Sequence, residues 1–165
     1  MRFALFLSFL SFNSVFAQTI LLEENFSSTS QSGLPVLWSQ STLSADGGWL
    51  SGTSNDLQSQ YWGIAAHGTF VATNDDACDC NKSEDYLITP PLNFTGLDNA
   101  ILSFAGFFSG QAFEGSTDRA TIEYSIDGGN SWIVLTEIAG NGNAENTVWE
   151  NHNVNLSEIL SYNDV

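Results

Sequence analysis

The 165-residue sequence predicts an all-β protein, a sandwich of two antiparallel sheets. Helical signals are weak, and Gly, Ser, Thr and Asn recur about every eight to twelve residues, which is typical of turns between short sandwich strands. Apolar and polar residues alternate from Ala120 to Ile126, so this segment has one buried face and one wet face. Hydrophobic residues make up 42% of the chain and aromatic residues 13%, which excludes a disordered acidic tail.

The first 17 residues are typical of a secretory signal peptide. Arg2 precedes an almost unbroken apolar run from Phe3 to Phe12, and small residues lead to a cleavage site after Ala17. A membrane anchor is the alternative, but the run is too short to span a bilayer. We therefore expect residues 18–165 to form one secreted domain that does not insert into membranes. Its expected location is extracellular, at the cell surface, or in the periplasm if it is not exported further.

Several segments of the secreted chain are expected to form strands. The segment Ala100–Phe108 is almost continuously apolar and is expected in the centre of a sheet. The residues Asp127–Asn130 tolerate positive φ and predict a hairpin turn, whereas Pro90-Pro91 ends a strand because proline cannot donate to a ladder. The expected strands are Thr19–Phe26, Trp49–Ser51, Thr69–Thr73, Tyr86–Thr89, Ala100–Phe108, Arg119–Ser125, Trp132–Glu137 and Thr147–Leu156.

The charge balance excludes two classes of partner. The chain carries 19 acidic residues against 3 basic ones, a net charge of −16. Nucleic-acid binding needs a basic footprint that displaces counterions from phosphates. An anionic membrane surface would also repel this chain.

The secreted chain holds two cysteines, Cys78 and Cys80, in a C-x-C arrangement. Secretion permits a disulfide, and two residues this close in a bent or extended loop lie within bridging distance. Free thiols are the alternative. A structural zinc site is not expected, because zinc needs four ligands.

The cysteines belong to an acidic segment, residues 74–85, with five carboxylates and one lysine. Hard oxygen ligands at this density favour calcium. Asp79, Asn81 and Ser83 have the spacing of the first EF-hand ligands, but Glu84 and Pro90 replace the required glycine and glutamate. An EF-hand is therefore excluded, and the alternatives are an irregular calcium loop or a solvated acidic loop.

The segment Ser125–Trp132 fits the Asp-box pattern S-x-D-x-G-x-S-W. The pattern is frequent in sialidase propellers, but a propeller needs several blades and this chain has one box. We therefore expect Ser125, Asp127, Gly129 and Trp132 to stabilise a turn rather than to form a glycosidase site.

No pattern indicates catalysis. His67 and His152 lie far apart and neither belongs to H-E-x-x-H, and the chain has no G-x-S-x-G or Walker A sequence. An enzyme acting on glycans through two carboxylates is the remaining enzymatic hypothesis, but no pair stands out. Five aromatic residues could stack on sugars or fill the core: Trp38, Trp49, Tyr61, Trp62 and Trp149.

An ordered set of motifs resembles the choice-of-anchor J, or cleaved-adhesin, domains, MAM-like modules of secreted Bacteroidetes proteins. The central match is Asp85–Gly96, which is similar to D-x-L-I-T-P-x-x-D-L-S-G. The other matching segments, in order, are Glu23–Phe26, Leu34–Trp38, Ala72–Cys80, Ser125–Trp132 and Trp149–Ser157.

The resemblance implies a jelly-roll β-sandwich, bound calcium, and adhesion to an extracellular protein or glycan without catalysis. The calcium ligands that it implies are Glu24, Asn74, Asp75, Asp76 and Asp85. Family members continue with two further strands beyond the point that matches residue 165, so a C-terminally incomplete domain is expected. An accessory remnant of a larger secreted peptidase or hydrolase is the alternative function.

Overall fold

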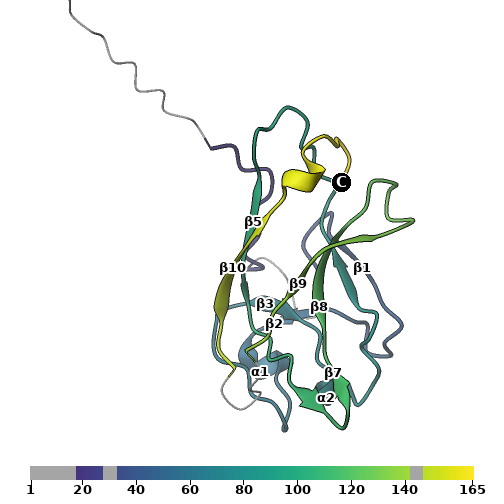
Figure 1. The fold of residues 1–165 in the computed structure, drawn as a ribbon. Helices are drawn as coiled ribbons and strands as arrows, with labels where there is room; N and C mark the ends of the chain where they lie inside the picture. Colours follow the sequence, from purple (N-terminus) through teal and green to yellow (C-terminus); the bar gives the residue numbers. More distant parts are fainter. Residues whose placement is uncertain (1–17, 28–32, 142–146) are drawn as a thin grey trace, which may run out of the picture.

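The computed structural model describes residues 18–27, 33–141 and 147–165 (Figure 1). The expected signal peptide, residues 1–17, lies outside the described residues. The strands are β1 (Ser39–Ser41), β2 (Leu50–Gly52), β3 (Phe70–Ala72), β4 (Tyr86–Ile88), β5 (Ile101–Gly106), β6 (Ala112–Phe113), β7 (Ser116–Thr117), β8 (Ala120–Tyr124), β9 (Ile133–Ile138) and β10 (Glu150–Asn155). The helices are α1 (Ser54–Leu57), α2 (Asp75–Cys78) and a 3-10 turn over Ser157–Ile159. Because each helix is a single short turn, the fold is all-β.

The described strands form antiparallel pairs: β1 with β4, β2 with β3, β5 with β10, β6 with β7, and β8 with β9. The pair β5–β10 is regular, from Gly106 opposite Glu150 to Ile101 opposite Asn155. The pair β8–β9 has a register shift between Ile122 and Glu123, where a bulge bends the strand. In Figure 1, β5–β10, the longest pair, lies on the left of the molecule, and β8–β9, the next longest, lies to its right, between β5–β10 and β1.

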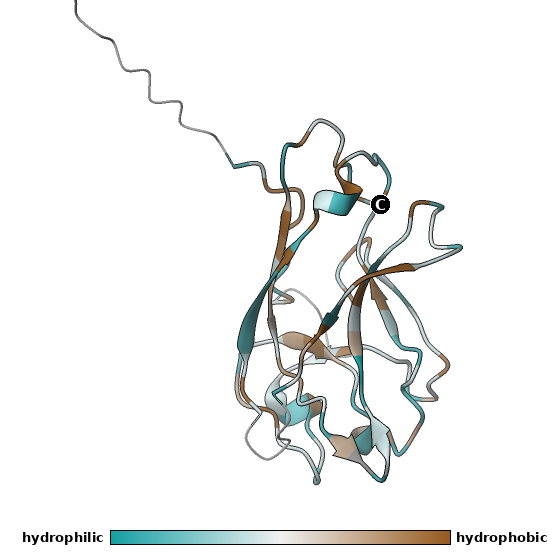
Figure 2. Ribbon diagram, viewed as in Figure 1, coloured by the Kyte–Doolittle hydropathy of each residue, from teal (hydrophilic) through white to brown (hydrophobic). Residues whose placement is uncertain are grey.

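Side chains from these two pairs meet in the larger of two apolar clusters. Its centre is Phe94, which is 2% exposed, with Val154, Leu156 and Ile159. Leu102 and Phe104 of β5, Ile122 and Tyr124 of β8, and Leu135 and Ile138 of β9 pack around this centre. Figure 2 shows the apolar stretches of both strand pairs in brown. Full burial of a valine, leucine, isoleucine or phenylalanine side chain, as at the centre of this cluster, stabilises the fold by about 1.5–3 kcal/mol.

The smaller cluster lies beside α1 and joins Leu57, Ile64 and Phe70 to Phe107 and Trp149. The rings of Phe70 and Phe107 lie 5.0 and 5.4 Å from that of Trp149. Trp62 stacks at a tilt on Phe107, at 5.2 Å. Two of the aromatic residues considered for sugar binding therefore serve in core packing.

Seven of the expected strands overlap observed ones, whereas the prediction of a strand over Thr19–Phe26 is wrong. The described part of this segment makes no ladder, and Phe26 has a positive φ of 58°. The Phe26 amide donates to Glu24 Oε1 at 2.5 Å, so a local turn takes the bond that a ladder would need.

Sequence reasoning also missed three short strands, β1, β6 and β7. The sequence of β1 is Ser-Gln-Ser, which carries no strand signal. It becomes a strand because Ser39 and Ser41 lie opposite Ile88 and Tyr86 of β4. The tertiary pairing thus decides this element.

Candidate functional site

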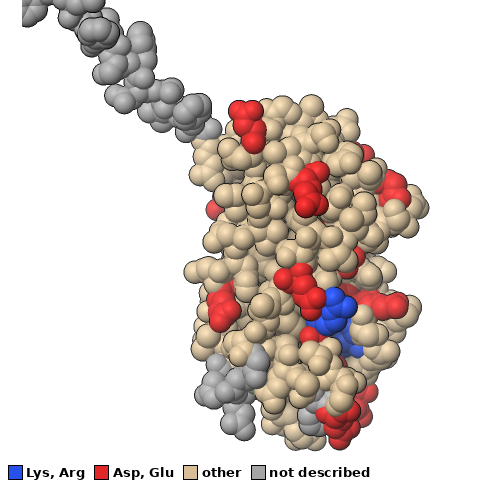
Figure 3. All heavy atoms as spheres, in the orientation of Figure 1, with Lys and Arg blue, Asp and Glu red and all other residues tan. Residues whose placement is uncertain are grey.

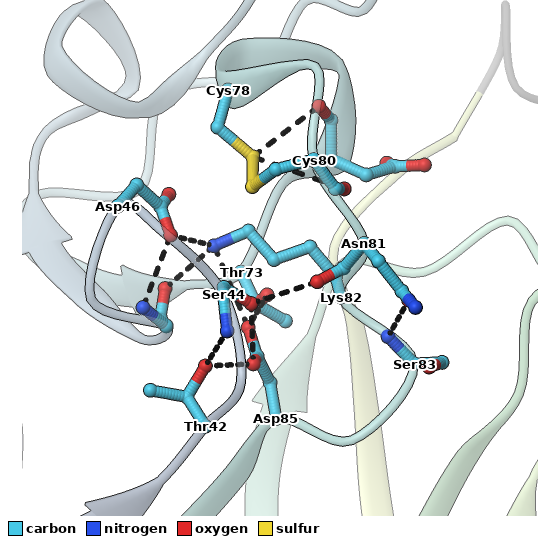
Figure 4. Close-up of a disulfide and its surroundings, with 12 residues drawn as sticks. Thr42, Ser44, Asp46, Thr73, Cys78, Cys80, Asn81, Lys82, Ser83 and Asp85 are labelled. Carbon is cyan, nitrogen blue, oxygen red and sulfur yellow. Dashed lines mark hydrogen bonds and ion pairs between the residues drawn. A yellow bond between two sulfur atoms is a disulfide. The ribbon is translucent and has the colours of Figure 1, made fainter.

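The segment 74–85 is built around the carboxylate of Asp85, which directly precedes β4 (Figure 4). Its Oδ1 accepts hydrogen bonds from the hydroxyls of Thr42 and Ser44, the latter at 2.7 Å. Its Oδ2 accepts one from the Thr73 hydroxyl at 2.7 Å. The loops after β1 and β3 are thereby tied to the start of β4.

Lys82 connects this carboxylate to a second one. Its Nζ lies 3.5 Å from Asp85 Oδ2 and 2.5 Å from Asp46 Oδ1, and it donates to the Gly48 carbonyl at 3.0 Å. The side chains of Lys82 and Asp85 are 8% and 2% exposed. Figure 4 shows Lys82 between the two carboxylates.

Both carboxyl groups are held in the charged form. Burial pushes the pKa of Asp85 upwards, but three hydroxyl donors and the Lys82 charge outweigh it, so this pKa is below its ordinary value. Burial likewise opposes the fall at Asp46, but the hydrogen bond from Lys82, the Gly48 amide and the Lys82 charge lower its pKa. The positive charge of Lys82 thus partly compensates the negative charges of both Asp46 and Asp85.

The second feature of the segment is a disulfide between Cys78 and Cys80, with a Cα–Cα distance of 5.2 Å. Cys78 ends α2, and Asp79 between the cysteines has a left-handed backbone with φ of 51°. This turn brings the two residues close enough to bridge.

A hollow of about 620 Å³ lies beside the disulfide. Tyr61 on its rim is 75% exposed. Its lining residues carry an aromatic ring, side-chain amides and carboxylates but no lysine or arginine: Gln60, Tyr61, Asp75, Asp76, Ala77, Cys78, Asp79, Cys80 and Asn81.

The predicted calcium ligands do not all converge. Among the histidine, cysteine, aspartate and glutamate side chains of the described residues, the one group of three ligand atoms within 4.8 Å of one another is Asp46, Cys78 and Cys80, and its two sulfurs belong to the disulfide. The Glu24 carboxylate accepts the Phe26 amide, and both oxygens of Asp85 are engaged as described above.

Asp75 and Asp76 lie on α2, exposed to solvent and near Asp118, which sequence reasoning missed. Burial, and then the charges of Asp75 and Asp76, raise the pKa of Asp118. Three carboxylates from two separate segments thus repel one another at this end of the molecule. Nothing in the sequence around Asp118 signals this proximity.

Asn74, also predicted as a ligand, precedes α2 and is buried. Its Nδ2 donates to the Leu57 carbonyl at 2.9 Å. Its Oδ1 is buried and accepts no hydrogen bond within the described part of the chain. An amide oxygen in this position is available to a cation or a water molecule.

The Asp-box residues form the hairpin between β8 and β9. Asp127 Oδ1 accepts the amides of Asn130 and Ser131 at 3.0 and 2.9 Å, and Oδ2 accepts the Ser131 hydroxyl at 2.6 Å. Ser125 Oγ accepts the Gly129 amide at 2.8 Å. The hydrogen bonds from Ser131 and Ser125 lower the pKa of Asp127 to about 2. The carboxylate thus stabilises the turn.

Trp132 of the Asp-box stacks on Tyr86 of β4, with ring centres 6.0 Å apart. Figure 3 shows acidic side chains spread over the face that is drawn and basic atoms gathered at one place on it. Among the residues that the structure describes, the exposed basic group is Arg119, whose Nη2 lies 2.6 Å from Glu137 Oε2. The surface is therefore dominated by negative charge.

Comparisons of the chain with family models, with curated proteins and with solved structures each find no match. Over the described residues, no helix combines the length and the apolar character needed to cross a membrane.

Proposed function

We propose that the protein is a secreted, non-catalytic adhesion or binding module with a jelly-roll-like sandwich fold, stabilised by calcium. The main support for the proposal is the hollow beside the disulfide, because much of its lining belongs to a segment that a disulfide and an ion pair hold in place. The disulfide and the Asp85–Lys82 interaction hold the segment 74–85 in place without enclosing it. The part of the lining that comes from this segment is therefore suited to binding, because little conformational entropy is lost there on association.

The lining of the hollow restricts the ligand. Asp75, Asp76 and Asp79 repel anionic groups, so the ligand is neutral or positively charged at the point of contact. The Tyr61 ring offers a flat apolar face, and Gln60 and Asn81 offer both donors and acceptors. Neutral glycans and basic extracellular peptides both satisfy these conditions.

The binding test screens the secreted chain, residues 18–165, against arrayed neutral and acidic glycans and immobilised basic and acidic peptides. We expect retention on neutral glycans or on basic peptides, and loss of it in Tyr61→Ala. The matched control is Val36→Ala, which shortens another highly exposed side chain outside the hollow. Equal retention of Tyr61→Ala and the native chain would contradict the role of the hollow, and hydrolysis of any glycan would contradict a non-catalytic function.

The calcium test compares thermal unfolding in calcium with unfolding in chelator. A ligand at a hundredfold its Kd stabilises the native state by about 2.7 kcal/mol. For a domain of this size that corresponds to a rise in Tm of about 8 °C. An unchanged Tm would contradict the calcium part of the proposal and leave the binding test unaffected.

A further inference from the structure

A small cavity lies between α1, α2 and the pair β2–β3, separate from the hollow at the surface. Its volume is about 40 Å³, and its polar lining comes from Asp46, Asp56 and Asn74. A water molecule needs roughly 10–15 Å³, so the space accommodates a small ion together with a water. Leu50, Leu57 and Ala72 close its apolar side.

Asn74 is one of the residues that line this cavity; it is 8% exposed, and its buried Oδ1 accepts no hydrogen bond from the described residues. The orientation of its amide follows from the hydrogen bond to the Leu57 carbonyl, because a flipped amide would place two oxygens against each other. The structure therefore holds a buried acceptor in place without a donor. A native fold retains such a group when a bound species satisfies it.

The charges around the cavity favour a cation over a water molecule. Asp46 and Asp56 contribute two carboxylates, and Asp56 is held by the amide and hydroxyl of Thr53 at 2.8 and 2.7 Å. Lys82 compensates one charge, which it shares between Asp46 and Asp85. The three carboxylates thus exceed the one ammonium, and oxygen ligands of this kind are those that calcium prefers.

We infer that Asn74 Oδ1, together with the carboxylates of Asp46 and Asp56, holds a calcium ion in this cavity. Asp85 is not a ligand, because its oxygens are engaged by three hydroxyls and by Lys82. The inference rests on the calcium part of the proposed function and locates it. Of the ligands predicted from the sequence it keeps Asn74 alone, and it adds Asp46 and Asp56, which were not predicted.

The test is calorimetric titration of the secreted chain with calcium chloride, combined with Tm in calcium and in chelator. Asn74→Asp adds a carboxylate oxygen at the orphaned position, so calcium should bind about tenfold more tightly. The same variant should unfold at a lower Tm than the native chain in chelator, because its buried charge is then uncompensated. Calcium should reverse most of this loss. Asn74→Ala should weaken binding at least about tenfold.

Two further variants are included: one tests the site without changing Asn74, and the other is a control. Asp56→Asn keeps an oxygen that can accept from Thr53 but removes a charge, so it should weaken calcium binding even if the Asn74 variants fail to fold. Asp79→Asn is the matched control, since it removes an exposed carboxylate from the same segment and suits a left-handed backbone. It should leave the Kd within about twofold of the native value.

The outcomes separate this inference from the broader proposal. Calcium binding with an unchanged Kd in Asn74→Asp, Asn74→Ala and Asp56→Asn would place the ion elsewhere and overturn the inference while calcium stabilisation survives. No calcium binding by the native chain would overturn both the inference and the calcium part of the proposed function. An equal loss of Tm by Asn74→Asp in calcium and in chelator would likewise overturn the inference.

Discussion

Replacing Asp85 with alanine should destabilise the protein more than any change to an exposed carboxylate. The Asp85 carboxylate accepts three hydroxyls, from the loops after β1 and β3, and lies beside Lys82. Asp85→Ala leaves the three hydroxyls without this acceptor and removes one of the two carboxylates that Lys82 contacts. The Trp49 indole would keep its bond to the Asp85 carbonyl, because that bond involves the backbone.

The size of the effect follows from burial. Removing one partner of a buried ion pair costs about 3–5 kcal/mol. The lower end applies here, because Lys82 retains Asp46 and the freed hydroxyls can bind water at the edge of the loop. We expect a loss of about 3 kcal/mol in the free energy of unfolding and a fall in Tm of about 9 °C. A domain with about 5–15 kcal/mol of total stability would survive this loss.

The assay is urea unfolding followed by circular dichroism, with Asp98→Ala as the control. Asp98 is exposed, and its removal should change the free energy of unfolding by less than about 0.5 kcal/mol. The double variant Asp85→Ala with Lys82→Ala should lose less than the sum of the two single variants, because the residues interact directly. Equal effects of Asp85→Ala and Asp98→Ala, or strict additivity of the pair, would refute the assigned role of this centre.

The remaining predictions concern the disulfide, acid stability, a repulsive carboxylate and the core. Serines at Cys78 and Cys80 should lower stability by only about 1.5 kcal/mol, since the closed loop is very short; urea unfolding with and without reductant measures this. The pKa of Asp127 is lower in the folded chain, about 2, than in the unfolded chain, about 4, so ionised Asp127 stabilises the fold fully above pH ~4 and this contribution is lost as the pH falls towards about 2. Asp127→Asn should therefore flatten the dependence of Tm on pH between these two values. The raised pKa of Asp118 has the opposite sign, so in chelator at pH 7 Asp118→Asn should raise Tm, and a fall would contradict the repulsion that we assign to it. Phe94→Ala should cost about 3–5 kcal/mol in urea unfolding, and a cost below about 1 kcal/mol would show that Phe94 is not central to the core.

The sequence predicts those strands in which apolar residues alternate with polar ones or form a continuous run. Ala120–Tyr124 alternates between apolar and polar residues, and Ile101–Gly106 is rich in apolar residues, so both were predicted as strands. The sequence did not predict β1, which forms because its polar residues pair with β4. It wrongly predicted a strand at Phe26, where the amide makes a local hydrogen bond instead of a ladder bond. Short strands with polar residues carry too little periodicity to be recognised alone.

The candidate site was predictable in part for a similar reason. The density of carboxylates and the C-x-C spacing identified the segment 74–85, because these signals are local in sequence. The partners that give Asp85 its role, Thr42, Ser44 and Thr73, have no such signal. Their contribution depends on loops that the sequence separates and the fold brings together.

Local patterns in the sequence are sufficient to predict the all-β class, the turn at Asp127 and the acidic character of the segment 74–85, since each depends on neighbours within a few residues. Only the tertiary structure decided which carboxylates are compensated and which are not. It placed Lys82 between Asp46 and Asp85, brought Asp118 towards α2, and left the oxygen of Asn74, a residue of the cavity lining, buried without a donor. The physical reason is that charge compensation and burial depend on distances in space, which chain spacing does not set once loops from different strand pairs meet.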